Sequence, residues 1–288
     1  MNNANTFFQT FGFDIKNSLR CNKWLIILCV ILFFMGCFFV KNQTRTYAQK
    51  VNDIRNYNEN DEEYISEKLH TPDYLLFLYR GAPRMSESKI SNSSKTDIPA
   101  MYIALMILCC CITSRFMTSD ICNITVYYSK TRTQWIISKL LCNFIVLFVG
   151  LIPGVIISVV YARGTFGYNQ DALKNLMSIK QYNANVKDFV CLLLLFILGA
   201  YTISVIQICI SLAFSYIIGL LTALSIYVFS LFSDKMFFIG NACMIQRSSM
   251  FNDGGWNPYI YVYIMLIILL ISITVTVLIN SKSDYLNN

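Results

Sequence analysis

The chain has 288 residues, of which 56% are hydrophobic and 14% are charged, with a formal net charge of +7. Soluble domains carry about 25% charged and about 45–50% apolar residues. The stretch from Phe189 to Phe232 has no charged side chain, and a water-soluble globule could not bury it. The 21 Phe, 18 Tyr and 3 Trp exclude intrinsic disorder. The composition therefore predicts a protein whose solvent is largely lipid.

Several kinds of chemistry are excluded by what the chain lacks. His70 is the single histidine, so imidazole clusters for metal binding and histidine-based triads are ruled out. Neither G-x-x-x-x-G-K-[ST] nor G-x-G-x-x-G occurs, so we expect no nucleotide site in this chain. The 11 cysteines form no C-x-x-C pair, and most lie in apolar runs where thiols pack as small hydrophobes. We expect no catalytic, cofactor or metal site, and hence no enzyme.

The first 23 residues predict an amphipathic helix. One stripe is apolar and a neighbouring face is basic; the residues are Phe8, Phe11, Ile15 and Leu19, then Lys16, Arg20 and Lys23. This pattern is typical of a helix that lies in the membrane interface with its cations near anionic headgroups. The alternative is a solvated leader that merely precedes a membrane span.

The segment from Trp24 to Val40 predicts the first span. Its apolar run is longer than that of a secretory signal, and no small-x-small cleavage site follows it, so we interpret it as a retained anchor.

The region 41–97 predicts a mostly helical loop. Thr44 to Arg55 is weakly helical, a second start lies near Asn60, and a third at Thr71 leads to a stop at Gly81. The loop is interpreted either as a small helical cap over the bilayer or as a passive tether. His70, between two of these helices, is expected at the surface.

Five further apolar segments bring the number of predicted spans to six. The uncharged run from Phe189 to Phe232 is too long for one span and fits two, with a turn near 211–215. The tryptophans support the edges, because indole rings favour the headgroup level; they are Trp24, Trp135 and Trp256.

The loop between spans two and three has the most specific pattern. Asp120 opens a polar segment, Lys130-Thr131-Arg132 follows, and Lys139 lies where span three begins. The chain resembles the permease subunits of type-2 ABC transporters, which have six spans, an N-terminal interfacial helix and a coupling helix after span two. That family more often has Glu where Asp120 stands, and commonly Gly-Thr where Asn123-Ile124-Thr125 stands.

The resemblance implies that four residues couple the chain to a cytoplasmic ATPase: Asp120, Asn123, Arg132 and Lys139. A helix that lies flat between two spans can convert a push from a soluble partner into a rotation of the bundle. The alternative for the cations is ordinary anchoring in the interface.

Within the spans, no Asp, Glu, Lys or Arg lies at a centre, which argues against proton- or sodium-coupled carriers and against an intramembrane hydrolase. Milder polar residues either line a translocation path or bond to a neighbouring helix; the path candidates are Tyr201, Ser204, Gln207, Thr222 and Ser225. Small residues at four-residue spacing predict close helix packing, as at Gly150, Gly154 and Ser158.

The expected fold is an all-α integral membrane protein with six transmembrane helices. The segments in chain order are the interfacial helix 1–23, span one 24–40, extracellular loop 41–97, span two 98–114, coupling loop 115–135, span three 136–161, extracellular loop 162–188, span four 189–210, turn 211–215, span five 216–232, extracellular loop 233–257, span six 258–280 and tail 281–288.

The resemblance implies the permease subunit of an ATP-driven exporter in the cell membrane, with both termini cytoplasmic. Charge alone leaves the orientation open. Eight Lys and Arg lie on the side of the termini and fifteen on the other side, but nine of these fifteen lie in the loop 41–97. That loop also has nine acidic residues and approaches the length at which the positive-inside rule loses force. Expected partners are ATPase subunits carrying ATP and Mg²⁺, a second or related permease, and membrane lipids, but no nucleic acid. The uncharged spans favour an amphipathic cargo such as an antimicrobial peptide.

The alternative is a membrane-embedded enzyme or an accessory or immunity protein that acts on lipid or peptide. Its candidate residues lie between the last two spans and lack a recognisable spacing: Asp234, Cys243 and Asp253.

Overall fold

The computed structural model describes residues 3–57, 67–82, 99–118, 131–177, 179, 186–233, 235, 238–251 and 254–282, with backbone alone at 3–6, 54–57, 175–177, 186 and 282. These residues form helices joined by turns, and within them the β-type pairing is a single isolated bridge between Ser248 and Trp256. The prediction of an all-helical fold is confirmed.

Five helices are long and apolar enough to cross a membrane, which indicates a membrane-embedded protein. They are α1 (Asn3–Tyr57), α4 (Ala100–Thr118), α6 (Arg132–Tyr161), α8 (Val186–Ala213) and α10 (Pro258–Lys282). The shorter elements are α2 (Thr71–Tyr79), α7 (Gln170–Met177), α9 (Tyr216–Phe232) and the 3₁₀ helices η1 (Ile239–Cys243) and η2 (Ile245–Arg247).

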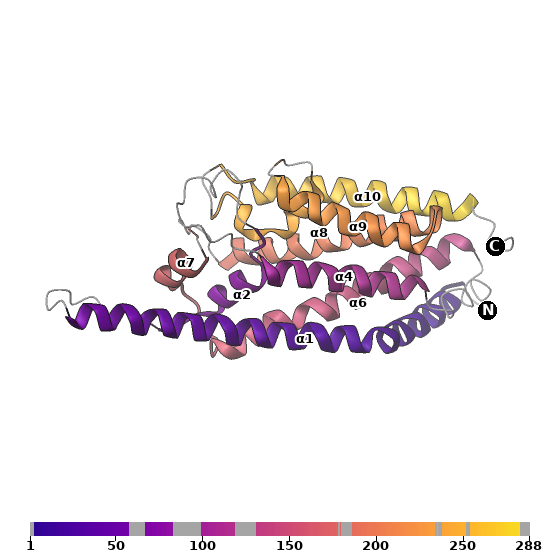
Figure 1. Ribbon diagram of the computed structural model, residues 1–288. Helices are drawn as coiled ribbons and strands as arrows, with labels where there is room; N and C mark the ends of the chain where they lie inside the picture. Colours follow the sequence, from indigo (N-terminus) through magenta and orange to yellow (C-terminus); the bar gives the residue numbers. More distant parts are fainter. Residues whose placement is uncertain are drawn as a thin grey trace.

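The long helices run side by side in one elongated bundle (Figure 1). α1 begins and α10 ends at the same end of this bundle. We call this the terminal end and the opposite one the far end. α8 and α9 are joined by a tight turn at Phe214, and α9 begins and ends at the residues predicted for span five.

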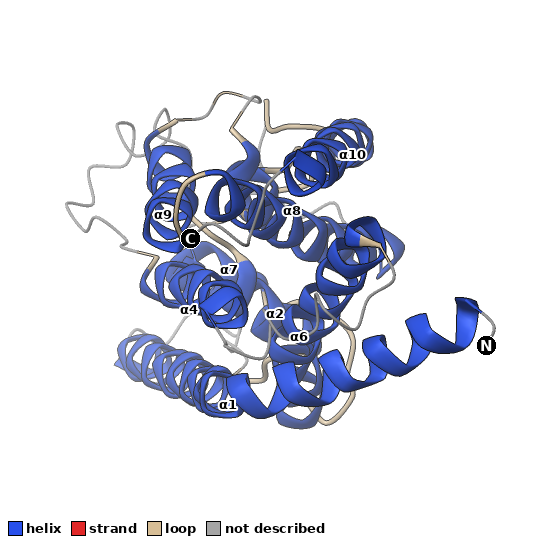
Figure 2. Ribbon diagram, turned by 90° about the vertical axis from the view of Figure 1, so that its right-hand side faces the viewer, coloured by secondary structure: helices blue, strands red, loops and turns tan. Residues whose placement is uncertain are grey.

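The sequence predicts three separate elements in residues 1–57, but the structure has one helix of 55 residues. At about 1.5 Å per residue α1 is about 80 Å long, whereas a bilayer core is about 30 Å thick. In Figure 2, which faces the terminal end, the N-terminal part of α1 runs sideways past α6 and ends beyond the other helices, which are seen more nearly end-on. At the far end α1 projects beyond the other helices (Figure 1).

One buried stripe follows α1 along its length and packs mainly against α6. It starts with polar residues and turns apolar where the first span was predicted; its members are Asp14, Ser18, Asn22, Cys29, Phe33, Cys37, Val40, Thr44 and Ala48. Asp14 meets Lys139, and the Cys37 thiol lies 4.0 Å from the Ser158 hydroxyl. α1 and α6 therefore run in the same direction, as two spans separated by one crossing must.

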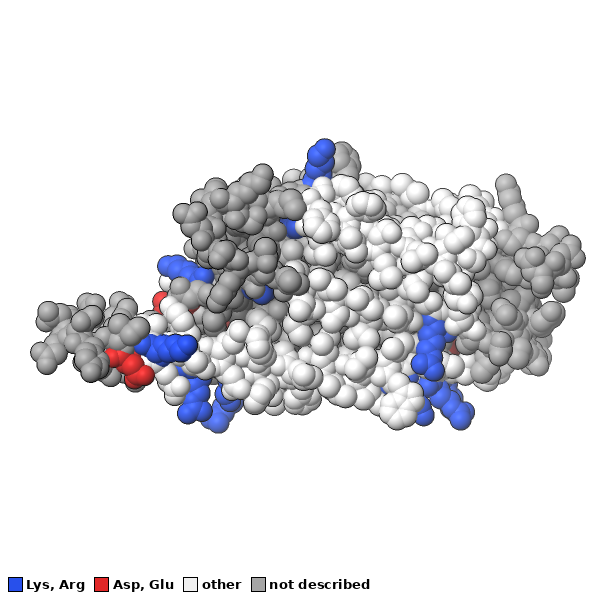
Figure 3. Space-filling view, in the orientation of Figure 1, with Lys and Arg blue, Asp and Glu red and all other residues white. Residues whose placement is uncertain are grey.

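The outer face of α1 between Lys23 and Lys41 is apolar. Seventeen uncharged residues, about 26 Å of helix, separate these two lysines. Large side chains point away from the bundle here, including Trp24 at 64% and Phe38 at 58% exposure. In Figure 3, an uncharged surface separates the Lys and Arg near the terminal end from those on the other half of the molecule. This width matches the hydrocarbon core of a bilayer.

α2 is not a cap on the outside of the bundle, as one interpretation of the loop had it. All nine of its residues are buried. It starts beside the end of α6, where the Thr71 amide donates to Thr165 O, and it ends where the Tyr79 hydroxyl donates to Leu151 O at 2.8 Å. A helix that is apolar on all sides must be covered on all sides. At nine residues it is too short to cross a membrane, and it ends inside the bundle.

A second segment, residues 239–248, also lies inside the bundle rather than in an outer loop. Met244 packs against Gly81, and the backbone N–H of Gln246 donates to the backbone carbonyl of Arg80. Arg247 is 1% exposed, and its guanidinium donates to carbonyl oxygens at the end of α9 and to Ala82 O. A cation at the C-terminal end of a helix is favourably placed relative to the helix dipole. Together with α2, this segment fills the far half of the bundle.

The small residues of α6 mark a close contact, as their spacing predicted. A β-carbon built at Gly154 would meet the Tyr79 hydroxyl and, at 2.9 Å, the Phe33 ring. Only glycine lets α1, α2 and α6 approach this closely.

Gly154→Ala should therefore destabilise the protein by about 1–3 kcal/mol, the usual cost of overpacking a well-filled core. Thermal unfolding of the detergent-solubilised protein measures the effect. Gly12→Ala is the matched control, because nothing lies within 4 Å of a β-carbon at that position. Equal melting temperatures for the Gly154 variant and the wild type would contradict the packing described here.

Candidate functional site

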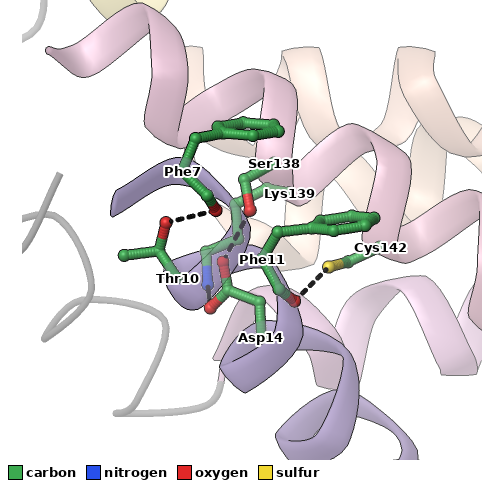
Figure 4. A network of polar contacts seen from close by, with 7 residues as sticks. All are labelled: Phe7, Thr10, Phe11, Asp14, Ser138, Lys139 and Cys142. Carbon is green, nitrogen blue, oxygen red and sulfur yellow. Dashed lines mark hydrogen bonds and ion pairs between the residues drawn. The ribbon is translucent and has the colours of Figure 1, made fainter. Parts of the chain in front are cut away.

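The terminal end holds a buried charge pair that joins α1 to α6. Asp14 Oδ1 lies 2.7 Å from Lys139 Nζ, and Asp14 Oδ2 accepts a hydrogen bond from Ser138 Oγ at 2.9 Å. The Lys139 and Asp14 side chains are 3% and 2% exposed. Next to the pair, the Cys142 thiol donates to Phe11 O at 3.8 Å. Figure 4 shows this junction, with the N-terminal part of α1 lying against the second and third turns of α6.

Lys139 also lies near two aromatic rings. Its ammonium is 5.5 Å from the ring centroid of Phe116 and 5.9 Å from that of Trp135. Phe116 belongs to the last turn of α4, and Trp135 to the first turn of α6. An ammonium group near aromatic faces is stabilised by their quadrupoles. The charge of Lys139 is thus satisfied inside the protein by groups from α1, α4 and α6.

This placement changes the role expected of Lys139. The sequence assigned it to coupling with an ATPase or to anchoring in the interface, and both roles need an accessible ammonium. In the structure the ammonium is enclosed, so it cannot contact a partner directly. Removing one member of such a buried pair costs about 3–5 kcal/mol, because the other charge stays desolvated.

The remaining coupling candidates are less fully described. Arg132 is half-buried as the first residue of α6, and its backbone carbonyl accepts from Asn280 Nδ2 at 2.9 Å, which ties α10 to α6. Asp120 and Asn123 lie outside the described residues. These two assignments stay predictions from the sequence.

The N-terminal helix is present, and it packs on α6 through a face that the sequence analysis did not single out. Phe8 is 67% exposed, and the rest of the apolar stripe is half-buried: Phe11, Ile15 and Leu19. The face toward α6 is polar and includes Asp14 and Ser18. The predicted basic face is exposed in full: Lys16, Arg20 and Lys23. The polar face was missed because the sequence analysis considered only the apolar stripe and the basic face, both of which stay available to lipid and headgroups.

The polar residues of α8 bond to neighbouring helices. The Tyr201 hydroxyl donates to Leu140 O at 3.1 Å, and Gln207 Nε2 donates to Cys110 O at 3.0 Å. Ser204 accepts from Asn143 Nδ2 at 2.7 Å. All three residues are buried. Within one chain, hydrogen bonding to a neighbouring helix therefore describes them better than lining a translocation path.

Two side-chain oxygens in this group have no hydrogen-bond partner: Asn143 Oδ1 and Gln207 Oε1. Both belong to residues at most 1% exposed. Unmade hydrogen bonds of buried amides are costly, so each oxygen has the capacity to accept from a further donor.

Thr222 and Ser225 differ from the α8 residues. Their hydroxyls donate to carbonyls of their own helix, Ile218 O and Leu221 O, each at 2.8 Å. Ser225 is exposed and Thr222 partly so. These two path candidates therefore face out of the bundle on α9.

At the far end, Asp73 organises the entry of α2 into the bundle. It is completely buried and accepts from the backbone amides of His70 at 2.9 Å and Asn169 at 3.1 Å. Burial raises the pKa of its carboxyl to about 6, against a usual value near 4, although both hydrogen bonds oppose this shift. The sequence analysis expected His70 at the surface, but in the structure it is half-buried and lies next to Gly167.

The described residues offer no metal centre, since no group of three or more His, Cys, Asp or Glu side chains is close enough to hold an ion. Of the three candidate residues for a membrane-embedded enzyme, the structure describes Cys243 alone. Cys243 is completely buried and donates to Phe196 O, and burial raises the pKa of its thiol, which disfavours the nucleophilic thiolate. Asp234 and Asp253 lie outside the described residues.

Two important residues were missed by the sequence analysis, Asp14 and Arg247. Asp14 stands among the cations of an amphipathic helix, where an acid looks like an ordinary surface residue. The available signal was its spacing with Ser18 and Asn22, which puts three polar side chains on one line. Arg247 lies in a segment without helical periodicity, and no local pattern reveals its burial.

In comparisons with known proteins, no family model, no curated protein and no solved structure matches this chain.

The burial of Asp73 predicts a pH dependence. Because its folded-state pKa is raised, its contribution favours the folded state below about pH 4 and is lost as the pH rises through about 6. In Asp73→Asn the amide oxygen can accept both backbone bonds without ionising. Relative to the wild type, this variant should therefore gain about 2–3 kcal/mol between pH 4 and pH 7.

Thermal unfolding in detergent at several pH values checks this expectation. Asp171→Asn, which changes an exposed carboxylate in the first turn of α7, serves as the control. A stability difference between Asp73→Asn and the wild type that stays constant from pH 4 to pH 7 would show that Asp73 does not titrate in this range.

Proposed function

We propose that this chain is the permease subunit of an ATP-driven exporter, moved by separate cytoplasmic ATPase subunits. The arrangement of the terminal end carries the proposal. There the N-terminal part of α1 runs sideways past α6 and is ion-paired to it (Figures 2 and 4). The same end holds the last turn of α4 and the first turn of α6, which flank the segment with Asp120 and Asn123. A force applied to this segment acts on two spans at once.

The proposal includes six crossings, with α9 as the fifth. α9 has 17 residues and no charged side chain, and at about 1.5 Å per residue it is about 26 Å long. It returns antiparallel along α8 after the turn at Phe214 (Figure 1). Local thinning of the bilayer accommodates spans slightly shorter than the hydrocarbon core. An even number of crossings agrees with the start of α1 and the end of α10 lying at one end.

We assign the terminal end to the cytoplasm. The three exposed cations of the N-terminal helix, Lys16, Arg20 and Lys23, would then face the anionic inner leaflet. The far end, with α2, α7 and the projecting part of α1, is extracellular in this orientation.

The energy source belongs to partner subunits, because the sequence contains no phosphate-binding loop. ATP and Mg²⁺ would be bound there. A second copy of the chain, or a related one, would complete the pathway, and Thr222 and Ser225 lie on the outer face of α9 where such a copy can reach them. Uncharged span interiors favour an amphipathic cargo, and we favour a peptide such as an antimicrobial.

Labelling from outside the cell tests the topology. Phe214→Cys places a thiol at an exposed site in the α8–α9 turn, and Lys235→Cys places one after α9. A membrane-impermeant maleimide should modify the second variant in intact cells, and the first only after permeabilisation. The wild type, with its native thiols, gives the background. Equal labelling of both variants in intact cells would rule out a crossing by α9.

Purification from native membranes tests the partner. The tagged chain in mild detergent should carry an ATP-hydrolysing subunit with a phosphate-binding loop. Arg132→Glu should reduce the recovered ATPase about tenfold, the effect of losing about 1.4 kcal/mol of interface energy. Lys50→Glu, at the opposite end of the bundle, is the matched control and should leave the recovery unchanged. Complexes without any ATPase would refute the proposed function.

A further inference from the structure

Asp14 has no place in the motif that suggested the proposed function, yet it is the acidic partner of the buried pair at the terminal end. We propose that Asp14 is a positioning residue: its ion pair with Lys139 joins the N-terminal part of α1 to the helix turns on both sides of residues 119–130, so that all three move as one body. The inference rests on the proposed function for what drives the motion, but the joint itself is a property of this chain.

The contacts of Lys139 define the joint. Its ammonium bonds to Asp14 of α1 at 2.7 Å and lies over the rings of Phe116 in α4 and Trp135 in α6. Phe116 is two residues before the end of α4, and Trp135 lies in the first turn of α6. One cation therefore touches the N-terminal helix and both helix ends that flank 119–130.

Much of the rest of the N-terminal helix faces away from the bundle, although Ser18 and Asn22 are buried and Leu19 packs against the core. Phe8 and Phe13 are 67% and 54% exposed, and Lys16 and Arg20 point outward. Contact with α6 is concentrated on the face that holds Phe11, Asp14 and Ser18. Within this face, the hydrogen-bonded ion pair is the contact that fixes one register.

Burial makes the joint resist opening. Separating Asp14 from Lys139 would leave two desolvated charges in a place that is 2–3% exposed, unless water enters with them. Ser138 occupies the second carboxylate oxygen, so both oxygens of Asp14 are held by α6. Motion of the last turn of α4 or the first turn of α6 would therefore carry the N-terminal helix with it.

Spin labels measure the joint in the isolated chain, without any ATPase. Labels introduced as non-canonical amino acids at the exposed positions Gln9 and Thr133 report the distance between the N-terminal helix and α6 in lipid nanodiscs. The wild type should give one narrow distance distribution. Asp14→Asn should at least double its width, while Asp14→Glu, which keeps the charge, should stay close to the wild type.

Controls separate the joint from general damage. Asp53→Asn removes an exposed carboxylate from the same helix and should change nothing. Asp14→Leu combined with Lys139→Leu leaves no unpaired charge, so it should fold even if Asp14→Asn does not, and its distribution should also broaden. A narrow distribution in both Asp14→Asn and the double variant would overturn the proposal.

The complex provides the second readout. In wild-type complexes, ATP with orthovanadate should leave the Gln9–Thr133 distance unchanged, because both sites belong to one body. In Asp14→Asn complexes the same treatment should shift it. A shift in the wild type larger than the width of its distribution would refute the rigid joint. If no ATPase co-purifies, the proposed function fails, while the measurement on the isolated chain still decides whether the joint exists.

Discussion

Several polar groups that enter the helical bundle of this protein meet partners from other helices. Lipid offers neither hydrogen bonds nor counter-charges, so a polar group buried in a membrane must be satisfied within the protein. The Asp14–Lys139 pair is the strongest case, because it encloses two opposite charges that are almost completely shielded from solvent. The amide and hydroxyl bonds between α6, α8 and α4 follow the same constraint in uncharged form.

The constraint also explains the two ends of the bundle. At the terminal end, α1 presents a polar line to α6 and leaves its apolar residues and its cations outside. That division suits a helix in the interface, where lipid tails and anionic headgroups lie side by side. The same helix is ion-paired and hydrogen-bonded to α6, and the proposed coupling to an ATPase would use this contact as part of a mechanical unit.

At the far end, two short segments enter the bundle and end inside it. α2 is apolar on all sides, and its start is closed by Asp73 and Asn169. The 239–248 segment has little regular structure, so its backbone needs partners, and Arg247 caps the carbonyls of α9 where the helix ends. Irregular backbone at this depth is tolerated because protein surrounds it. If the protein is an exporter in the proposed orientation, α2 and the 239–248 segment would lie on the extracellular side of the pathway.

Much of the architecture is determined by the sequence alone. Apolar runs without charges must become helices in lipid, so the long apolar helices, the turn after α8 and the start of α2 at Thr71 were predictable from composition, length and capping residues. The small residues of α6 likewise predicted a close helix contact, which Gly154 makes with α1 and α2. These features depend on neighbours within a few turns of the chain.

Tertiary structure alone decided the rest. Nothing local shows that Asp14 faces Lys139, which lies 125 residues away, or that Arg247 turns inward. The path candidates Tyr201, Ser204 and Gln207 could equally have faced a pore, and only the position of α4 and α6 shows that they bond between helices. The physical reason is that hydropathy determines which segments enter the membrane, whereas the pairing of polar groups depends on how the inserted helices are rotated and placed against each other.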